Sequence, residues 1–179
     1  MEEVMGAIEA FTPEKLVCGI LVSREELLAP ARERLCARFG PVDYEGGPFP
    51  FTFTGYYDDE MGTPITRYFL SFERLLAPDA LAEVKVFTNE TEDLYAENGK
   101  RRVNLDPGLI SLKRLILAST KDNGRRVPLS KGIYAEITLI FTDGAFRALP
   151  WTYPDYRSSE YLKVMSRIRE IYKSQLKQL

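Results

Sequence analysis

The sequence predicts one α+β domain with a mixed, mainly antiparallel sheet, and three observations support this. Its 179 residues, 45% of them hydrophobic, suit a single domain with a sizeable core. In the first half, apolar runs and helical patterns follow the order strand, helix, strand, strand, helix, strand, which a ferredoxin-like βαββαβ unit would have. The second half contains short strand patterns separated by turn dipeptides, which predicts a β meander before a C-terminal helix.

The first half begins with a predicted N-terminal arm at residues 1–14, and the α+β domain is expected to span 15–179. Residues 15–22 form a continuous apolar run, which is typical of a buried strand. Ser23 and Glu26 fit a capping box, so we expect a helix to start there and to end at Gly40-Pro41. Its apolar face would be Leu27, Ala31, Leu35 and Phe39.

An aromatic segment and a second strand–helix pair follow. Phe49, Phe51 and Phe53 alternate between turn residues, which predicts an extended segment with one aromatic face. Residues 65–76 predict a long strand whose even positions face the core and whose odd positions are partly polar. Pro78 suits the first turn of the next helix, which Asn98-Gly99 would end.

The second half starts with a short strand at 101–105, which Asp106-Pro107-Gly108 is expected to end as a turn. Residues 112–120 fit a helix or a strand, and their short apolar run favours the strand. The remaining predicted elements are an edge strand at 126–129, a strong strand at 132–141, a hairpin at Asp143-Gly144 into 145–149, and a helix from 160 to about 178.

The composition excludes several classes of site. The chain contains no histidine, which rules out Ser-His-Asp and Cys-His catalysis and HExxH zinc sites. Any acid–base chemistry must therefore use Asp, Glu, Lys, Tyr or Cys. Cys18 and Cys36 form no CxxC pair, so we expect two buried structural thiols in a reducing compartment. No apolar run is long enough to cross a membrane and the N-terminus is acidic, so we expect a cytoplasmic protein.

Charge is distributed unevenly along the chain. Residues 43–97 hold twelve acidic and three basic residues, whereas residues 100–131 hold nine basic and two acidic ones. These segments could be solvated faces that attract each other, or the second could form a basic surface for a phosphorylated ligand. Nucleic acid is an unlikely partner because the net charge is −2 and the pI is about 5.4.

Nucleotide motifs give little support for phosphate binding by a standard loop. The chain contains neither GxxxxGK[ST] nor GxGxxG. Thr120-Lys121-Asp122 is superficially like the guanine-reading segment of GTPases, but the spacing between the lysine and the acid differs.

Three clusters carry residues that suit a ligand site. Asn104 and Asp106 could face a ligand from a strand end, or cap a turn with their own backbone. Tyr134 and Glu136 share one face of the strongest strand, which either faces solvent or lines a pocket. The third cluster is a loop, which forms either an aromatic lid or a binding surface, and it holds Trp151, Tyr153, Asp155, Tyr156 and Arg157.

Several longer strings share a family resemblance. NLDPG at 104–108, LASTKD at 117–122, GIYAEITLIF at 132–141 and LPWTYPDYRS at 149–158 resemble the prokaryotic family called domain of unknown function 4416. PFPFTFTGYYDDEMG at 48–62 and FLSFERL at 69–75 are also similar to it. The resemblance runs from about Lys15 into the C-terminal helix. It implies no established activity or catalytic residue, and some family members are labelled GTP-binding.

The first hypothesis is a domain that binds or acts on a small phosphorylated or carboxylated molecule. Asp106 or Glu136 would be the general base, with Lys121 and Arg157 as electrostatic stabilisers. The other ligand-binding candidates are Asn104, Asp155 and the aromatic residues Tyr56, Tyr134, Trp151, Tyr153 and Tyr156. A divalent metal could be held by Glu73, Asp106 and Glu136, because hard cations prefer oxygen ligands.

Two other functions remain open. The aromatic residues at 49–53 and 151–156 also suit a non-catalytic protein-interaction module. GTP binding without a phosphate loop is the third alternative. The sequence does not specify an oligomeric state.

Overall fold

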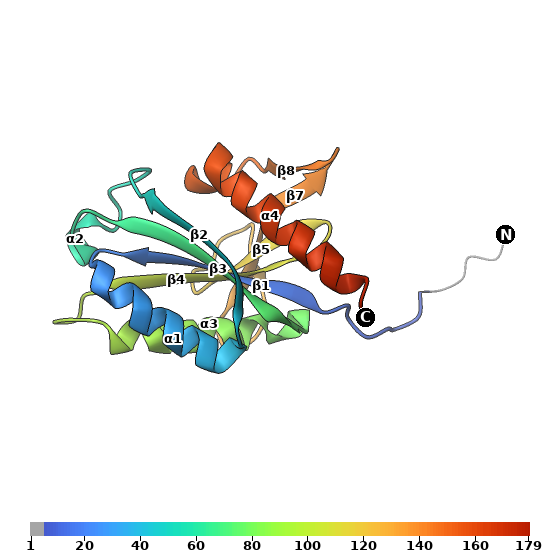
Figure 1. Cartoon of the computed structure of the whole chain (residues 1–179), viewed down its shortest axis with the longest axis horizontal. Coiled ribbons are helices and arrows are strands. Elements are labelled where there is room, and N and C mark those ends of the chain that lie inside the picture. Colours follow the sequence, from blue (N-terminus) through green and yellow to red (C-terminus); the bar gives the residue numbers. More distant parts are fainter. Residues whose placement is uncertain (1–5) are drawn as a thin grey trace.

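Strand β1 (Glu14–Val22) is the central strand of the structure, and its side chains are buried on both faces of the sheet. The computed structural model describes residues 6–179 (Figure 1). β1 pairs antiparallel with β3 (Thr66–Leu76) on one side and with β4 (Val103–Ile110) on the other. β2 (Val42–Pro50) pairs antiparallel with β3, which gives the strand order β2-β3-β1-β4.

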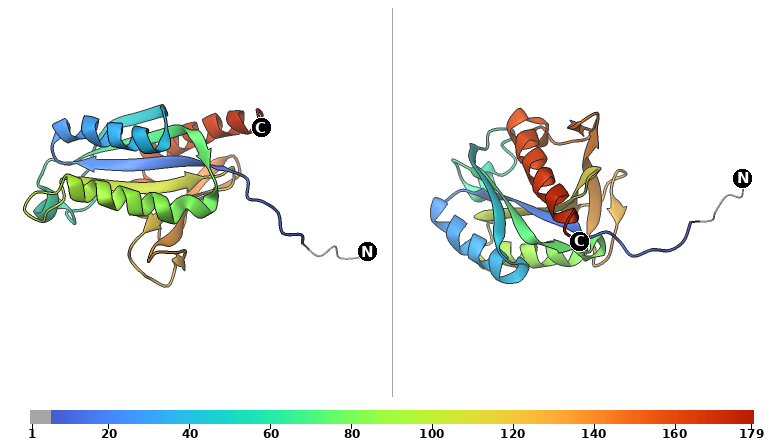
Figure 2. Two further views of the ribbon diagram at one scale, coloured as in Figure 1. Left: turned by 90° about the horizontal axis from the view of Figure 1, so that it is seen from below. Right: turned by 45° about the vertical axis from the view of Figure 1, so that its right-hand side comes forward.

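Helices α1 (Leu28–Phe39) and α3 (Leu81–Leu94) cover one face of these four strands (Figure 2). Their apolar sides pack against the even positions of β1, including Leu16 and Ile20. Short 3₁₀ turns precede both helices, η1 (Glu25–Leu27) and η2 (Pro78–Ala80). With the short helix α2 (Asp58–Met61) in the β2–β3 connection, the first half has the predicted ferredoxin-like order.

The second half extends the same sheet. β5 (Arg114–Ser119) pairs with β7 (Tyr134–Thr142), which also carries β6 (Val127–Pro128) and β8 (Ala145–Ala148). Residues 114–119 are therefore a strand, and the hairpin at Asp143-Gly144 is confirmed. After the 3₁₀ turn η3 (Asp155–Arg157), helix α4 (Ser159–Leu176) packs on the opposite sheet face from α1 and α3 (Figure 1).

β4 and β5 form a fork, because they pair only from Gly108 to Ile110. On the other side of that point, β4 stays paired with β1 down to Val103, while β5 continues with β7 to Ser119. The backbone N–H and C=O of Leu105 both face the open side of the fork. Its carbonyl accepts a hydrogen bond from the Lys85 ammonium (2.9 Å), and its N–H donates to the Glu92 carboxylate (2.6 Å). Side chains of α3 thus replace a partner strand.

The predicted turn at Asp106-Pro107-Gly108 is wrong, because these residues lie inside β4. Along a strand, the backbone N–H and C=O groups of every second residue point to the same side. The nitrogen of Pro107 therefore points the same way as that of Leu105, away from β1. The missing N–H of Pro107 therefore removes no bond to β1. A proline is tolerated inside the sheet because it lies beside the fork.

Two helix-boundary predictions also differ from the structure. Ser23 makes no capping bond, because Arg24 precedes η1 and the first turn is 3₁₀ rather than α. α3 ends at Leu94, before Asn98-Gly99, which form a tight turn between the hydrogen-bonded residues Glu97 and Lys100. The predicted N-terminal start and C-terminal stop were therefore misplaced, although both helices exist.

The predicted aromatic segment needs correction, whereas the predicted pattern of β3 is confirmed. β2 starts at Val42 and ends at Pro50, so Phe51 and Phe53 lie beyond it in the connection to α2. The odd positions of β3 are partly polar, and near the start of the strand Arg67, Phe69 and Ser71 are all buried. β3 lies between β1 and β2 in the sheet and is covered on this face by α4.

The described N-terminal residues lie outside the sheet and the helices. Residues 6–13 of the predicted N-terminal arm have no regular secondary structure and expose Ile8 and Phe11, while residues 1–5 lie outside the described part. Within residues 6–179, none of the helices combines the length and the apolar character that a membrane crossing requires.

Candidate functional site

A cavity of about 540 Å³ opens at the fork between β4 and β5. It is lined by both strands, by the start of β3, by α3, and by the loops at 51–57 and 153–156. Six of the lining residues are aromatic, five are basic and three are acidic. The aromatic ones are Phe51, Phe53, Tyr56, Tyr57, Tyr153 and Tyr156, and the charged ones are Arg67, Lys85, Arg101, Lys121, Arg126, Asp106, Glu136 and Asp155.

The cavity floor, which we define as Arg67, Asn104, Asp106 and Asp155, is organised around one buried arginine. The Arg67 side chain is only 2% exposed, and its guanidinium donates to Asp106 Oδ2 (2.8 Å) and to Asp155 Oδ2 (3.2 Å). It also lies over the ring of Phe51, 5.4 Å from its centroid. β3, β4 and η3 are therefore joined at the floor by one cation and two carboxylates.

Gly19 of β1 makes this arrangement possible. It lies between Phe69 of β3 and Asp106 of β4 in the sheet register. A Cβ atom at this position would be 2.7 Å from Arg67 Nη1 and 3.3 Å from the Tyr156 hydroxyl oxygen. The absence of a side chain allows the guanidinium to cross above β1 and reach Asp106.

Burial and Arg67 act in opposite directions on the two carboxyl groups. Burial tends to raise the pKa of Asp106, but the positive charges of Arg67 and Lys85 hold that pKa below its usual value. Burial raises the pKa of Asp155, and Arg67 only partly offsets this. Asp106 is therefore the carboxyl group of the pair whose ionised form the site favours more strongly, and its side chain remains 26% exposed toward the cavity.

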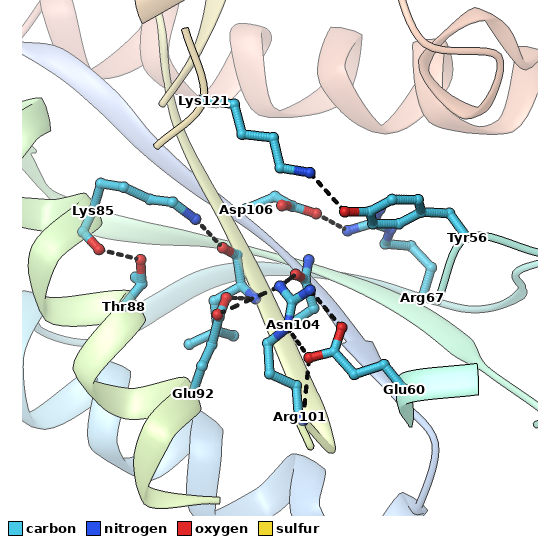
Figure 3. A network of polar contacts seen from close by, with 11 residues as sticks. Tyr56, Glu60, Arg67, Lys85, Thr88, Glu92, Arg101, Asn104, Asp106 and Lys121 are labelled. Carbon is cyan, nitrogen blue, oxygen red and sulfur yellow. Dashed lines mark hydrogen bonds and ion pairs between the residues drawn. The ribbon is translucent and has the colours of Figure 1, made fainter. Parts of the chain in front are cut away.

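Asn104 lies beside Asp106 on the same face of β4. Its Oδ1 accepts a hydrogen bond from Arg101 Nη1 (2.8 Å), and Arg101 is held in turn by two bonds of 2.7 Å to the Glu60 carboxylate (Figure 3). This fixes the amide so that Nδ2 is the free end. Asn104 is only 3% exposed, yet Nδ2 has no hydrogen-bonding partner among residues 6–179.

On the far side of the fork, α3 contributes Lys85 and Glu92, which hold the Leu105 peptide (Figure 3). Only Lys85 reaches the cavity lining. Burial raises the pKa of Glu92 to about 7, although the charge of Lys85 opposes the shift. Glu92 is thus a buried carboxyl group that titrates near neutral pH.

One wall of the cavity is a second buried ion pair. Arg126 Nε donates to Glu136 Oε2 (3.0 Å), and both side chains are almost fully buried. The guanidinium also donates to Ser119 Oγ (2.9 Å) and to the Tyr153 hydroxyl (2.9 Å). The Glu136 carboxylate is therefore occupied by its ion pair with Arg126, and Arg126 links β5, β7 and the 153–156 loop.

The cavity mouth, which we define as Tyr56 and Lys121, has a different character. Both residues are exposed, and the Lys121 ammonium donates to the Tyr56 hydroxyl oxygen (2.6 Å) above the floor (Figure 3). This bond and the positive charge of Lys121 lower the pKa of Tyr56. No carboxylate within residues 6–179 lies at ion-pair distance from the Lys121 ammonium.

The structure brings eight of the predicted site residues together in this lining. They are Tyr56, Asn104, Asp106, Lys121, Glu136, Tyr153, Asp155 and Tyr156. Their role in binding or catalysis stays a prediction, but they lie around one concave space rather than along a flat face.

Four other candidates lie outside the lining. Arg157 donates to the carbonyls of Leu149, Pro150 and Thr152, so it closes its own loop. Trp151 donates from its indole to the Ile137 carbonyl (2.8 Å) and anchors the same loop to β7. Tyr134 and Glu73 are also absent from the cavity wall, and Glu73 lines a separate, smaller hollow with Gln175.

The predicted metal set does not come together. Asp106 and Glu136 line the cavity, but Glu73 lies toward the other end of β3 beside α4. No group of three Asp, Glu or Cys side chains suited to holding a metal ion occurs in the described chain, residues 6–179. The observed oxygen donors are instead paired with Arg67 and Arg126.

Besides Arg67, sequence reasoning missed six basic or aromatic residues of the lining, namely Phe51, Phe53, Tyr57, Lys85, Arg101 and Arg126. Arg67 is the centre of the floor. A usable signal for Arg67 existed, because it shares the odd face of β3 with Phe69, and an arginine between such neighbours requires acidic partners. No local pattern indicates Lys85 and Arg101, since their place depends on the β4–β5 fork.

Comparisons with curated proteins and with solved structures gave no match. A family model does match, over residues 12–172, which is nearly the whole chain and includes every residue of the cavity lining. The matched region agrees with the resemblance carried by the strings at 48–62, 104–108, 117–122, 132–141 and 149–158. The chain belongs to the family described as Domain of unknown function (DUF4416).

Proposed function

We propose that the cavity at the β4–β5 fork binds a small molecule with a phosphate or carboxylate group. The observation that carries this proposal is the charge of the Lys121 ammonium at the cavity mouth, which has no carboxylate of residues 6–179 within ion-pair distance. An exposed ammonium beside a concave site attracts anions and donates up to three hydrogen bonds to them. Its present partner is the hydroxyl oxygen of the exposed Tyr56 rather than a carboxylate.

The size and walls of the cavity also support binding of a small molecule. A volume of about 540 Å³ falls within the usual range of ligand pockets, which runs from roughly 300 to 1,000 Å³. Phe51, Tyr57 and Tyr153 provide flat apolar surface, while their neighbours supply fixed polar groups. Arg67 and Arg126 are held rigidly, so the site is largely preformed.

If the domain is an enzyme, Asp106 is a better candidate for the general base than Glu136. Asp106 keeps part of its carboxylate open to the cavity and is ionised at neutral pH. Glu136 is instead bound by Arg126 in a nearly dry wall. Lys121 would then stabilise negative charge on the substrate.

A protein-interaction module is the second candidate, supported by apolar side chains exposed beside the cavity. Val127 is 64% exposed, Leu129 43% and Ile137 40%, on or next to β6 and β7. Pull-down with the purified chain, followed by loss of capture in Val127→Asp and Ile137→Asp, would favour this function. GTP binding is the third candidate, because Ser119, Thr120 and Lys121 line the cavity although no phosphate loop is present.

A thermal-shift screen tests the proposed function. Sugar phosphates, nucleotides including GTP, and carboxylic acids are compared on the wild type, Lys121→Ala and Lys113→Ala. Lys113 is an exposed lysine at the tip between β4 and β5, away from the cavity, and is the matched control. A ligand at a hundred times its Kd stabilises the folded state by about 2.7 kcal/mol.

We expect at least one anionic compound to raise the melting temperature of the wild type and Lys113→Ala, with a smaller rise in Lys121→Ala. No shift with any anion, or equal shifts in all three proteins, would contradict anion binding at this cavity.

We also infer a reducing, cytoplasmic location. Cys18 and Cys36 are both free, and burial raises the pKa of the Cys18 thiol, which makes it unreactive. Localisation of a tagged full-length chain in cell fractions tests this.

A further inference from the structure

The cavity has two chemically different ends. At the floor, the charge of Arg67 is already matched by Asp106 and Asp155, so this buried cation offers little attraction to an anion. The carboxylates would repel one. At the mouth, Lys121 has no carboxylate within ion-pair distance among residues 6–179, and the neighbouring Glu60 is paired with Arg101. An anionic group is therefore favoured at the mouth and disfavoured at the floor.

The floor offers a donor and an acceptor side by side. Asn104 is held by Arg101 through its Oδ1, which leaves Nδ2 as a buried donor with no partner among residues 6–179. Asp106, two residues along the same strand face, presents a partly exposed carboxylate that accepts from Arg67 and lies near enough to the Asn104 amide for that amide to help lower its pKa. A hydroxyl group can accept from the first and donate to the second at the same time.

An unmet donor in a buried site costs free energy, and a ligand that satisfies it recovers that cost. Phe51 packs over Arg67 of the floor and against Tyr57, which in turn packs against Tyr56 of the mouth, and both rings belong to the lining. They suit the carbon skeleton of a compact molecule whose ends are polar.

We propose that the ligand is a hydroxyl-bearing molecule with one anionic terminus, such as a sugar phosphate or sugar acid, bound with its hydroxyls on Asn104 and Asp106 and its anion at Lys121. This inference rests on the proposed function and adds the substrate class and its orientation. A nucleotide or a simple carboxylate would satisfy the mouth but would leave the floor donor without its required partner unless it also presents hydroxyls there.

Titration calorimetry with matched compounds tests the two ends separately. The probes are glycerol 3-phosphate, ribose 5-phosphate and glucose 6-phosphate, each with its neutral parent, together with gluconate, inorganic phosphate and the hydroxyl-free butyl phosphate. The proteins are the wild type, Lys121→Ala, Lys113→Ala, Lys85→Met and Asn104→Leu. Asn104→Ser, which keeps a smaller polar group, replaces the leucine variant if that one does not fold.

We expect one or more of the sugar anions to bind the wild type at least about tenfold more tightly than both its neutral parent and butyl phosphate, a difference of 1.4 kcal/mol. Lys121→Ala should remove the advantage over the neutral parent, while Lys113→Ala should keep it. Asn104→Leu should lower the affinity for the sugar anion and leave that for butyl phosphate unchanged. Gluconate distinguishes a carboxylate terminus from a phosphate.

Three results would overturn the inference while leaving anion binding intact. They are equal affinity for butyl phosphate and the sugar phosphates, an anion advantage that survives Lys121→Ala, and loss of that advantage only in Lys85→Met, which would place the anion at the α3 side. Failure of every anion to bind would instead contradict the proposed function itself.

Discussion

At the scale of single residues, the site depends on Arg67 and on the space that Gly19 leaves for it. An arginine that is almost fully buried is costly unless its charge is paired with acidic groups. Asp106 and Asp155 pair with it from β4 and η3 and accept from Nη1 and Nη2, Phe51 covers the guanidinium face, and Nε has no partner among residues 6–179. The arrangement fixes Asp106 in the position from which it can reach a ligand.

Gly19→Ala tests this account of the floor. The new methyl group would lie 2.7 Å from Arg67 Nη1, so either the guanidinium or the strand must move. Overpacking of this kind costs about 1–3 kcal/mol of unfolding free energy, which urea denaturation measures. Gly124→Ala is the control, because its Cβ would meet no atom within 4 Å and its φ is not positive. Equal stability of the two variants would contradict the close approach.

Glu92 predicts a specific pH dependence of stability. Its pKa is about 7 in the folded protein against an ordinary value of 4.5, so the folded state binds more protons between those values. The stability that Glu92 contributes is complete below pH 4.5 and is lost as pH rises through 7. We expect wild type to lose up to about 3 kcal/mol relative to Glu92→Gln across this range.

The measurement is the difference in unfolding free energy between these two proteins at pH 4.5, 6 and 8, which cancels the titration of other groups. A difference that is constant with pH, or that grows in the opposite direction, would show that folding does not raise the pKa of Glu92.

At the scale of elements, the β4–β5 fork creates the cavity. Two strands that separate leave unpaired peptide groups, and a sheet tolerates this only when other groups bind them. Lys85 and Glu92 from α3 do so at Leu105, and Pro107 removes a donor that would otherwise need a partner. The fork is therefore built into the sequence of β4 and α3 together.

Hydrogen exchange tests the fork directly. The Leu105 amide has no partner strand but donates to Glu92, so we expect slow exchange in the wild type and faster exchange in Glu92→Ala. Leu109 pairs with Ile116 of β5, and its amide should keep its protection in both proteins. Unchanged exchange at Leu105 in the variant would mean that the side chain does not replace the missing strand.

Sequence patterns predicted the elements better than their junctions. The buried strand at β1, the hairpin at Asp143-Gly144 and the apolar face of α4 follow from local periodicity, and the structure confirms them. The continuation of β4 through Pro107 could not be predicted, because it depends on where β5 diverges. Local turn preference alone favoured the wrong outcome.

The same limit applies to the site. Asn104, Asp106, Lys121 and Tyr56 were found from residue type and loop position, and they do line one cavity. Arg157 was chosen for its chemistry but is used by its own loop, whose three carbonyls need a donor. The number of backbone acceptors around an arginine is a property of the folded loop and is not visible in the sequence.

At the scale of the whole molecule, the acidic segment 43–97 and the basic segment 100–131 form ion pairs with each other. Arg101 pairs with Glu60, Arg102 with Glu97, and Lys131 with Glu83, so basic residues of 100–131 meet acidic residues of 43–97. This agrees with two faces that attract each other. Lys121 differs from these residues, since its charge is directed to the cavity mouth.

The layers of the molecule predict cooperative unfolding. β1 contributes to the apolar cluster under α1 and α3, to the one under α4, and to a third one around Phe51. Loss of β1 would disrupt all three, so we expect a single equilibrium transition. Far-UV circular dichroism and the fluorescence of Trp151, in the loop before α4, should give the same urea midpoint. Separate midpoints would indicate two independently folding parts.

The central claim is that anions bind at the β4–β5 fork, and chemical-shift mapping of the ¹⁵N-labelled protein tests it most directly. The probe is whichever of ribose 5-phosphate, glucose 6-phosphate or gluconate stabilises the protein most. The account predicts that the largest amide shifts fall at 53–57, 104–106 and 117–121, and that they shrink in Lys121→Ala. Shifts concentrated on α1 or β8, or no shifts with any of the three compounds, would contradict it.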